Sequence, residues 1–213
     1  MAHPHELPQD HRAAELPDTT YDVIVIGAGP TGENVADYAG RGGLSTLLVE
    51  SELVGGECSY WACMPSKALL RPVELVSEAR AMAGVSVGPL DVAAVLARRD
   101  SFASHWRDDG QIGWAEQTGI AVARGQGRIT GEKQVEVDGV TFTARYAVCV
   151  ATGTKAAVPP VEGLAEARPW TNREATTAKT LPGRLVVLGV RESEVTAVSS
   201  ATVTHFLTVA WSR

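Results

Sequence analysis

The sequence has few cysteines, a shortage of positive charge and no long apolar run, and each of these features argues against a class of protein. Three cysteines in 213 residues do not make a disulfide-stabilised secreted domain. The net charge is −6 and there is no basic block, which argues against a nucleic-acid surface or an anionic membrane as partner. No apolar run approaches the ~20 residues that a membrane-spanning helix needs. With 45% hydrophobic and 21% charged residues, the chain is typical of a soluble globular protein.

Residues 1–19 have the composition of a flexible tail, with prolines and scattered charges. This segment lacks the basic and apolar regions of a secretory signal, so we expect a cytoplasmic protein. Tail histidines are usually solvated, so we predict no metal site from the three that occur here. They are His3, His5 and His11.

Alternating strand and helix patterns predict an α/β fold. Uninterrupted apolar, β-branched runs are typical of buried parallel strands, whereas apolar residues at helical spacing predict helices. The expected elements are strands at 21–26 and 45–49 around a helix at 31–41, helices at 65–83 and 91–117, short strands over 120–150, a Pro-rich connection over 155–183 and a strand at 185–188.

A glycine-rich turn follows the first expected strand. Gly27, Gly29 and Gly32 fit the pattern G-x-G-x-x-G, with Pro30 inside it. The first glycine permits a tight turn, the second lets the backbone approach a pyrophosphate, and the third lets the next helix pack closely. Glu50 ends the next strand, where a carboxylate would accept hydrogen bonds from a ribose. These features predict a dinucleotide site, with an unrelated glycine-rich turn as the alternative, and the loop does not distinguish FAD from NAD.

Two cysteines, Cys58 and Cys63, are separated by four residues. A helical pattern begins near Pro65 and places Cys63 at a helix N-terminus, where the helix dipole favours a thiolate. A thiol pair of this kind closes and reopens as a disulfide. A zinc site is one alternative, although no second pair of ligands lies nearby, and two inert buried cysteines are the other. The residue types alone leave these three interpretations open.

The segment 55–70, GGECSYWACMPSKALL, resembles the redox-disulfide signature of the class I pyridine nucleotide-disulfide oxidoreductases. That family includes dihydrolipoamide dehydrogenase, glutathione reductase and mercuric reductase. Further stretches resemble its motifs in the same order, namely the loop at 27–32 with Glu50, the glycines at 125–127, the turn VATGT at 150–154 and the Pro- and Gly-containing stretch at 159–164. The resemblance implies a Rossmann-like FAD-binding domain, built from a parallel sheet with helices and a small β-meander.

The resemblance also implies roles for individual residues. Cys63 would face the flavin, and Cys58 would attack a disulfide substrate. Lys67 would lie near the flavin ring, with an exposed helical lysine as the alternative. The other residues expected to bind FAD are Gly27, Gly29, Pro30, Gly32, Glu50, Gly55, Gly56, Gly127, Ala151, Thr152 and Gly153. Electrons would pass from NAD(P)H through FAD to the cysteine pair and on to a small-molecule disulfide or similar acceptor.

The family pattern breaks off near Gly189, where the loop of an NAD(P)H domain lacks its second and third glycines. We therefore expect a chain truncated by a change of reading frame, without the interface domain through which the family forms homodimers. The expected parts are a flexible tail at 1–19, an FAD-binding domain with the redox pair at 20–155, a linker with the first strand of the NAD(P)H domain at 156–189 and an atypical tail at 190–213. A non-catalytic remnant that binds flavin at most partially, and a thiol-redox module without flavin, are the alternative functions.

Overall fold

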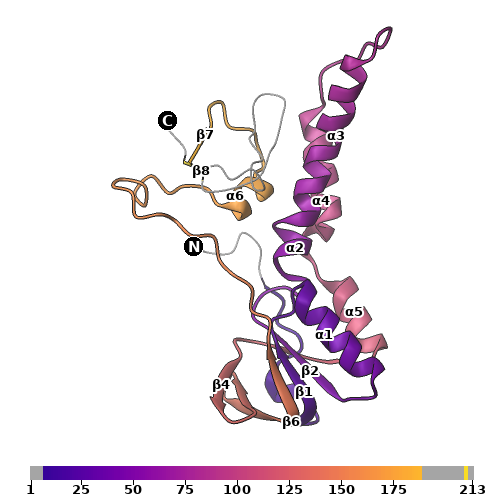
Figure 1. Cartoon of the computed structure of the whole chain (residues 1–213), viewed down its shortest axis with the longest axis vertical. Coiled ribbons are helices and arrows are strands. Elements are labelled where there is room, and N and C mark those ends of the chain that lie inside the picture. Colours follow the sequence, from indigo (N-terminus) through magenta and orange to yellow (C-terminus); the bar gives the residue numbers. More distant parts are fainter. Residues whose placement is uncertain (1–6, 189–208, 211–213) are drawn as a thin grey trace. The chain divides into compact units, whose positions relative to one another are not determined.

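The computed structural model describes residues 7–188 and 209–210, and it shows an α/β fold (Figure 1). By internal contacts the chain divides into two compact units, Met1–Cys58 with Trp106–Gly153 and Ser59–His105 with Thr154–Arg213. The segment 59–105 therefore groups with residues beyond 153, although the sequence predicts one domain over 20–155. Apart from residues 209–210, the expected tail at 190–213 lies outside the described residues.

The first unit contains a six-stranded sheet in the order β3-β2-β1-β6-β5-β4. Its strands are β1 (Thr20–Ile26), β2 (Thr46–Glu50), β3 (Ala121–Arg124), β4 (Arg128–Gly131), β5 (Gln134–Val137) and β6 (Val140–Val150). β1 pairs in parallel with both β2 and β6, and β2 pairs in parallel with β3. β4, β5 and the first residues of β6 form an antiparallel meander. The predicted parallel sheet with a small meander is thus confirmed.

Both faces of the parallel strands are buried, which explains their uninterrupted apolar runs. On one face, Val25 and Leu48 pack with helices α1 (Pro30–Arg41) and α5 (Asp109–Gln117). On the other, Ile24 and Leu47 pack with apolar residues of β5 and β6. Figure 1 shows α1 and α5 lying beside each other on the sheet. Because side chains alternate along each strand, each strand contributes residues to two separate hydrophobic cores, one on each face of the sheet.

The N-terminal segment differs from the expected flexible tail. Ala13 is only 2% exposed and belongs to a core cluster with residues of the sheet, within a short 3₁₀ helix, Ala13–Glu15. The carbonyl of His11 accepts a hydrogen bond of 2.8 Å from the backbone N–H of Arg124 at the end of β3. Asp10 forms an ion pair with the Arg124 side chain. Residues 10–15 are thus held against the sheet by one apolar contact and several polar contacts. The local sequence pattern does not predict these contacts.

The second unit contains two long helices that lie side by side, α3 (Cys63–Ala81) and α4 (Val92–Phe102) (Figure 1). It also contains α6 (Asn172–Thr177) and a small antiparallel pair, β7 (Val186–Val187) with β8 (Val209–Ala210). β7 lies inside the strand expected at 185–188. A short helix, α2 (Gly56–Tyr60), precedes α3 and carries Cys58.

The single helix expected over 91–117 is wrong, because α4 and α5 are separate helices. Ser104, His105 and Trp106 between them all have positive φ angles, of 48°, 52° and 56°. Such angles are unfavourable for residues other than glycine and break a right-handed helix. Trp106 is buried, and Asp108 binds Arg124 just after the break. We infer that these contacts override the helical preference of the local sequence.

Candidate functional site

The candidate site lies where the strand order of the sheet reverses. The chain runs from β1 outward to β2 and β3, and then returns to β6 on the other side of β1. In open α/β sheets, ligands bind beyond the carboxyl ends of the strands at this switch point. The backbone N–H of Ala151, just after β6, donates to the Ile26 carbonyl at 2.8 Å. The turns that follow β1 and β6 therefore begin next to each other.

The three glycines of the first loop have different structural roles. Gly27 has a φ of +99°, and a Cβ there would overlap the carbonyl oxygen of Ala151. A Cβ at Gly32 would overlap the carbonyl oxygen of Gly27, because α1 begins directly against the loop. A Cβ at Gly29, in contrast, would have no atom within 4 Å. The fold thus needs glycine at 27 and 32, whereas position 29 leaves the backbone accessible to a ligand.

The start of α1 offers backbone donors next to that open position. Gly29 is the N-cap and has no side chain, and Pro30 at the first helical position has no N–H. The N–H groups of Thr31 and Gly32 lie in the first turn, where helical geometry provides no acceptor. The aligned peptide dipoles add partial positive charge at this end. This arrangement suits an anion such as a phosphate.

Glu50 ends β2 beside the same loop. Its Oε2 accepts from the Ala28 N–H at 2.7 Å, and its Oε1 accepts from the Glu52 N–H at 2.8 Å. Burial raises the pKa of Glu50, and these backbone hydrogen bonds only partly oppose that effect. Glu33, in the first turn of α1, also has a raised pKa, mainly from burial and in addition from the charge of Glu50. Glu33 was not predicted from the sequence, although it is an acidic residue in the first turn of a helix that follows a glycine loop.

Two further glycines pack against the loop from the segment after β2. The Gly55 N–H donates to the Ala28 carbonyl at 2.7 Å. A Cβ at Gly56 would lie 2.8 Å from the Cα of Gly29, so the two backbones are in direct contact. At Gly127, a Cβ would lie 3.1 Å from side chains at the ends of β1 and β2. The first unit also contains the remaining predicted FAD ligands after β6, Ala151, Thr152 and Gly153.

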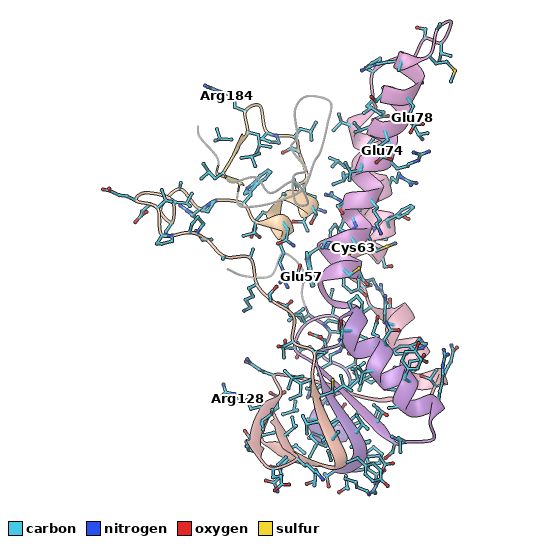
Figure 2. The ribbon with its side chains drawn as sticks, in the orientation of Figure 1. Glu57, Cys63, Glu74, Glu78, Arg128 and Arg184 are labelled. Atoms are coloured by element: carbon cyan, nitrogen blue, oxygen red, sulfur yellow. The ribbon has the colours of Figure 1, made fainter. Side chains whose placement is uncertain are left out.

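Cys63 begins α3, as the sequence predicts (Figure 2). Lys67 is exposed and lies four residues after Cys63. Because residues four apart are neighbours on a helix, the two share a face of α3. Figure 2 shows Glu74 and Glu78 farther along the same helix. Cys63 and Lys67 belong to the second unit, whereas Cys58 belongs to the first.

All three cysteines are partly buried and are in the thiol form in this structure. A redox pair alternates between this form and a disulfide. The pairing of Cys58 with Cys63 therefore stays a prediction. Cys149 packs as a small hydrophobic residue against the apolar cluster beneath α1 and α5.

A buried ion pair that was not predicted from the sequence supports the segment that leads to Gly55 and Gly56. Arg124, at the end of β3, donates to both oxygens of Asp108, at 2.8 Å and 3.0 Å. Asp108 also accepts from the Val54 N–H at 2.8 Å. Burial alone would lower the pKa of Arg124, but hydrogen bonds and charges from Asp108 and Asp10 raise it overall. An arginine at the end of an apolar strand gives no local sign of such a partner.

Comparisons with known proteins agree with this geometry. A sequence profile of the family described as "Pyridine nucleotide-disulphide oxidoreductase" matches residues 21–202. The match continues beyond Gly189, so the expectation that the family pattern ends there was wrong.

Within the described part of the chain, no helix has both the length and the apolar character that crossing a membrane requires.

Individual relatives are similar over most of this chain. A mercuric reductase of Staphylococcus aureus is 31% identical over 176 residues, which cover 81% of this chain and 32% of the relative. A dihydrolipoyl dehydrogenase of Chlorobaculum parvum is 34% identical over 184 residues, which cover 83% of this chain and 39% of the relative. The chain thus spans less than two fifths of the length of these relatives.

A solved structure shares the fold. The HOCl-induced flavoprotein disulfide reductase RclA from Escherichia coli has a TM-score of 0.61 at 22% identity, over 76% of this chain and 35% of that chain. Its similarity supports the Rossmann-like architecture that the strand order already indicates. From the match over residues 21–202, the chain belongs to the pyridine nucleotide-disulphide oxidoreductase family.

Proposed function

We propose that this chain forms the FAD-binding part of an oxidoreductase that transfers electrons from NAD(P)H to a disulfide or similar acceptor. The observation that carries the proposal is the open backbone at Gly29, next to the first-turn N–H groups of α1 at the switch point of the sheet. A pyrophosphate needs such an approach, and a glycine-rich turn of another kind does not.

The residues present fit FAD. The pyrophosphate would bind the N–H groups of Thr31 and Gly32 beside Gly29. Glu50 would bind the adenosine ribose, because a carboxylate has about four acceptor positions and backbone N–H groups occupy only part of them. When bound, FAD takes up a hydride from NAD(P)H and supplies two electrons for the reduction of a disulfide. The backbone approaches at Gly55, Gly56 and Gly127 keep side chains out of the same region.

The cysteine pair would exchange these electrons with the acceptor. In the dithiol form, the Cys58 sulfur attacks one sulfur of an acceptor disulfide, and the other acceptor sulfur leaves and takes a proton. The Cys63 sulfur then displaces the first acceptor sulfur, which also takes a proton, and a Cys58–Cys63 disulfide remains. Two electrons and two protons have then passed from the pair to the acceptor. Lys67 would lie on the flavin side of Cys63.

Flavin uptake by a Gly29→Ala variant tests the cofactor part of the proposal. A Cβ at position 29 meets open space, and a φ of −72° suits alanine, so the fold should survive. The same Cβ would obstruct a pyrophosphate, so we expect at least a tenfold weaker affinity for FAD, since each lost ~1.4 kcal/mol is tenfold. Affinity is measured from the flavin absorbance near ~450 nm during titration with FAD.

Gly113→Ala is the matched control. It adds a Cβ in open space on α5, in the same unit but on a helix outside the glycine loop. Equal FAD affinity of the two variants, or a folded wild-type chain that takes up no flavin, would overturn the proposal. The second outcome would support a non-catalytic remnant.

A further inference from the structure

Helix α6 is attached to the short segment that separates the two cysteines. Trp61 lies between α2 and α3, and only 1% of its surface is exposed. Its backbone carbonyl accepts from the Asn172 Nδ2 at 3.2 Å and lies 3.0 Å from the hydroxyl oxygen of Thr176. The Arg173 guanidinium stacks over the Trp61 ring at 4.1 Å from its centre. Three residues of one turn of α6 thus contact a single residue of the cysteine segment.

The helix that provides these contacts is itself fixed at both ends. At its start, Thr171 and Glu174 form a capping box. At its end, the fully buried Arg99 of α4 donates to the backbone carbonyls of Thr176 and Ala178. α6 is therefore a rigid support rather than a loosely packed turn.

We propose that Thr176 and Asn172 are positioning residues for the Cys58–Cys63 pair. They fix the Trp61 carbonyl, which belongs to the peptide bond joining Trp61 to Ala62. These two residues are the whole link between the end of α2 and the start of α3 at Cys63. The inference rests on the proposed redox function of the pair.

The physical basis is the entropy of ring closure. A disulfide between Cys58 and Cys63 closes a ring through the backbone, and every freely rotating bond of that ring opposes closure. Hydrogen bonds to the Trp61 carbonyl restrict the link before the ring closes. Loss of one of them should therefore shift the equilibrium of the pair toward the dithiol.

Thr176 is suited to a test because a neighbouring residue provides a control. The hydroxyl of Thr176 is within reach of the Trp61 carbonyl and of carbonyls in its own helix. The hydroxyl of Thr177 donates to the Arg173 carbonyl at 2.7 Å, within α6. Thr176→Val and Thr177→Val both replace a hydroxyl by a methyl group, but the first alone removes a donor near Trp61.

The experiment measures the thiol–disulfide equilibrium of the full chain, with Cys149→Ser in every variant so that Cys58 and Cys63 are the thiols counted. The protein is equilibrated with reduced and oxidised glutathione, trapped with an alkylating reagent and analysed by mass spectrometry. Thr176→Val should lower the equilibrium constant for disulfide formation about fivefold, the ratio expected for one lost hydrogen bond. Thr177→Val, and Thr176→Ser, which keeps the hydroxyl, should remain within about twofold of the parent.

Equal shifts for Thr176→Val and Thr177→Val would overturn the inference, because they would indicate a general loosening of α6. If Thr176→Val does not fold, Asn172→Ala removes the second donor and is expected to give the same direction of shift. A parent chain that forms no disulfide at any glutathione ratio would refute the redox pair itself, and the inference with it. FAD titration of the Gly29→Ala variant is independent of this result, so the two failures are distinguishable.

Discussion

Two adjacent aspartates, Asp108 and Asp109, each bind an arginine in different surroundings. Asp108 is 2% exposed and binds Arg124 through both oxygens. Asp109 binds Arg107 at 2.8 Å, and both of these side chains are mostly exposed. We predict that Asp108→Asn strongly destabilises the first unit and that Asp109→Asn has little effect. The pair of substitutions changes the same functional group at neighbouring positions.

The magnitude follows from what remains after the substitution. Asparagine at position 108 keeps one carbonyl oxygen for the Val54 N–H, but Arg124 loses its buried counter-charge. Removing one partner of a buried ion pair costs about 3–5 kcal/mol, because the other charge stays buried and unpaired. Asp10 still binds the Arg124 Nε at 2.6 Å from a half-exposed position. We therefore expect the lower end, about 3 kcal/mol, which is a large part of the ~5–15 kcal/mol of a typical domain.

Urea unfolding followed by circular dichroism measures the effect. With a slope of about 1–3 kcal/mol per molar urea, the Asp108→Asn midpoint should fall by about 1 M or more. An exposed pair is screened by solvent and contributes little, so the Asp109→Asn midpoint should stay near that of the wild type. Combining Asp108→Leu with Arg124→Met removes both charges and should recover part of the loss. Equal midpoints for Asp108→Asn and Asp109→Asn would refute the importance of the buried pair.

Two further predictions concern the dinucleotide loop. Gly32→Ala should lower the free energy of unfolding by about 2 kcal/mol or more, because the added Cβ would overlap the Gly27 backbone carbonyl; a urea midpoint equal to that of Gly113→Ala would contradict this. Burial raises the pKa of Glu50 in the folded state, so the folded chain retains this proton at pH values where the unfolded chain has lost it. The contribution of Glu50 to stability therefore falls as the pH rises above about 4.5. Urea unfolding at several pH values should show this fall in the free energy of unfolding of the wild type and a smaller fall for Glu50→Gln. The same dependence on pH in both proteins would exclude a raised pKa of Glu50 as its cause.

Features of the fold with a local physical cause were predictable from the sequence. Strands buried on both faces need apolar residues at every position, so the runs at 21–26 and 45–49 indicated parallel strands. A proline in the first turn, followed by a helical pattern, located the start of α3 close to Cys63. In each case the signal lies within a few residues of the feature that it predicts.

Features that depend on distant partners were not predictable in this way. Arg124 is 114 residues from Asp10, and Arg99 is 77 residues from Thr176. Each pair decides local structure, since the first holds the N-terminal segment on the sheet and the second fixes the end of α6. Neither arginine differs in its neighbourhood from an ordinary surface arginine. Only the topology that brings the partners together reveals these contacts.

The glycine loop shows how the structure strengthens a motif that is weak by itself. The pattern G-x-G-x-x-G treats its three glycines alike, but the fold requires only Gly27 and Gly32, whose added Cβ atoms would overlap backbone carbonyls. Nothing in the folded chain excludes a side chain at Gly29, which has an ordinary φ and open space. A glycine that the fold does not require is explained by a ligand that must approach the backbone at that position. The contrast between position 29 and positions 27 and 32 is therefore the physical reason to prefer a pyrophosphate site over an unrelated turn.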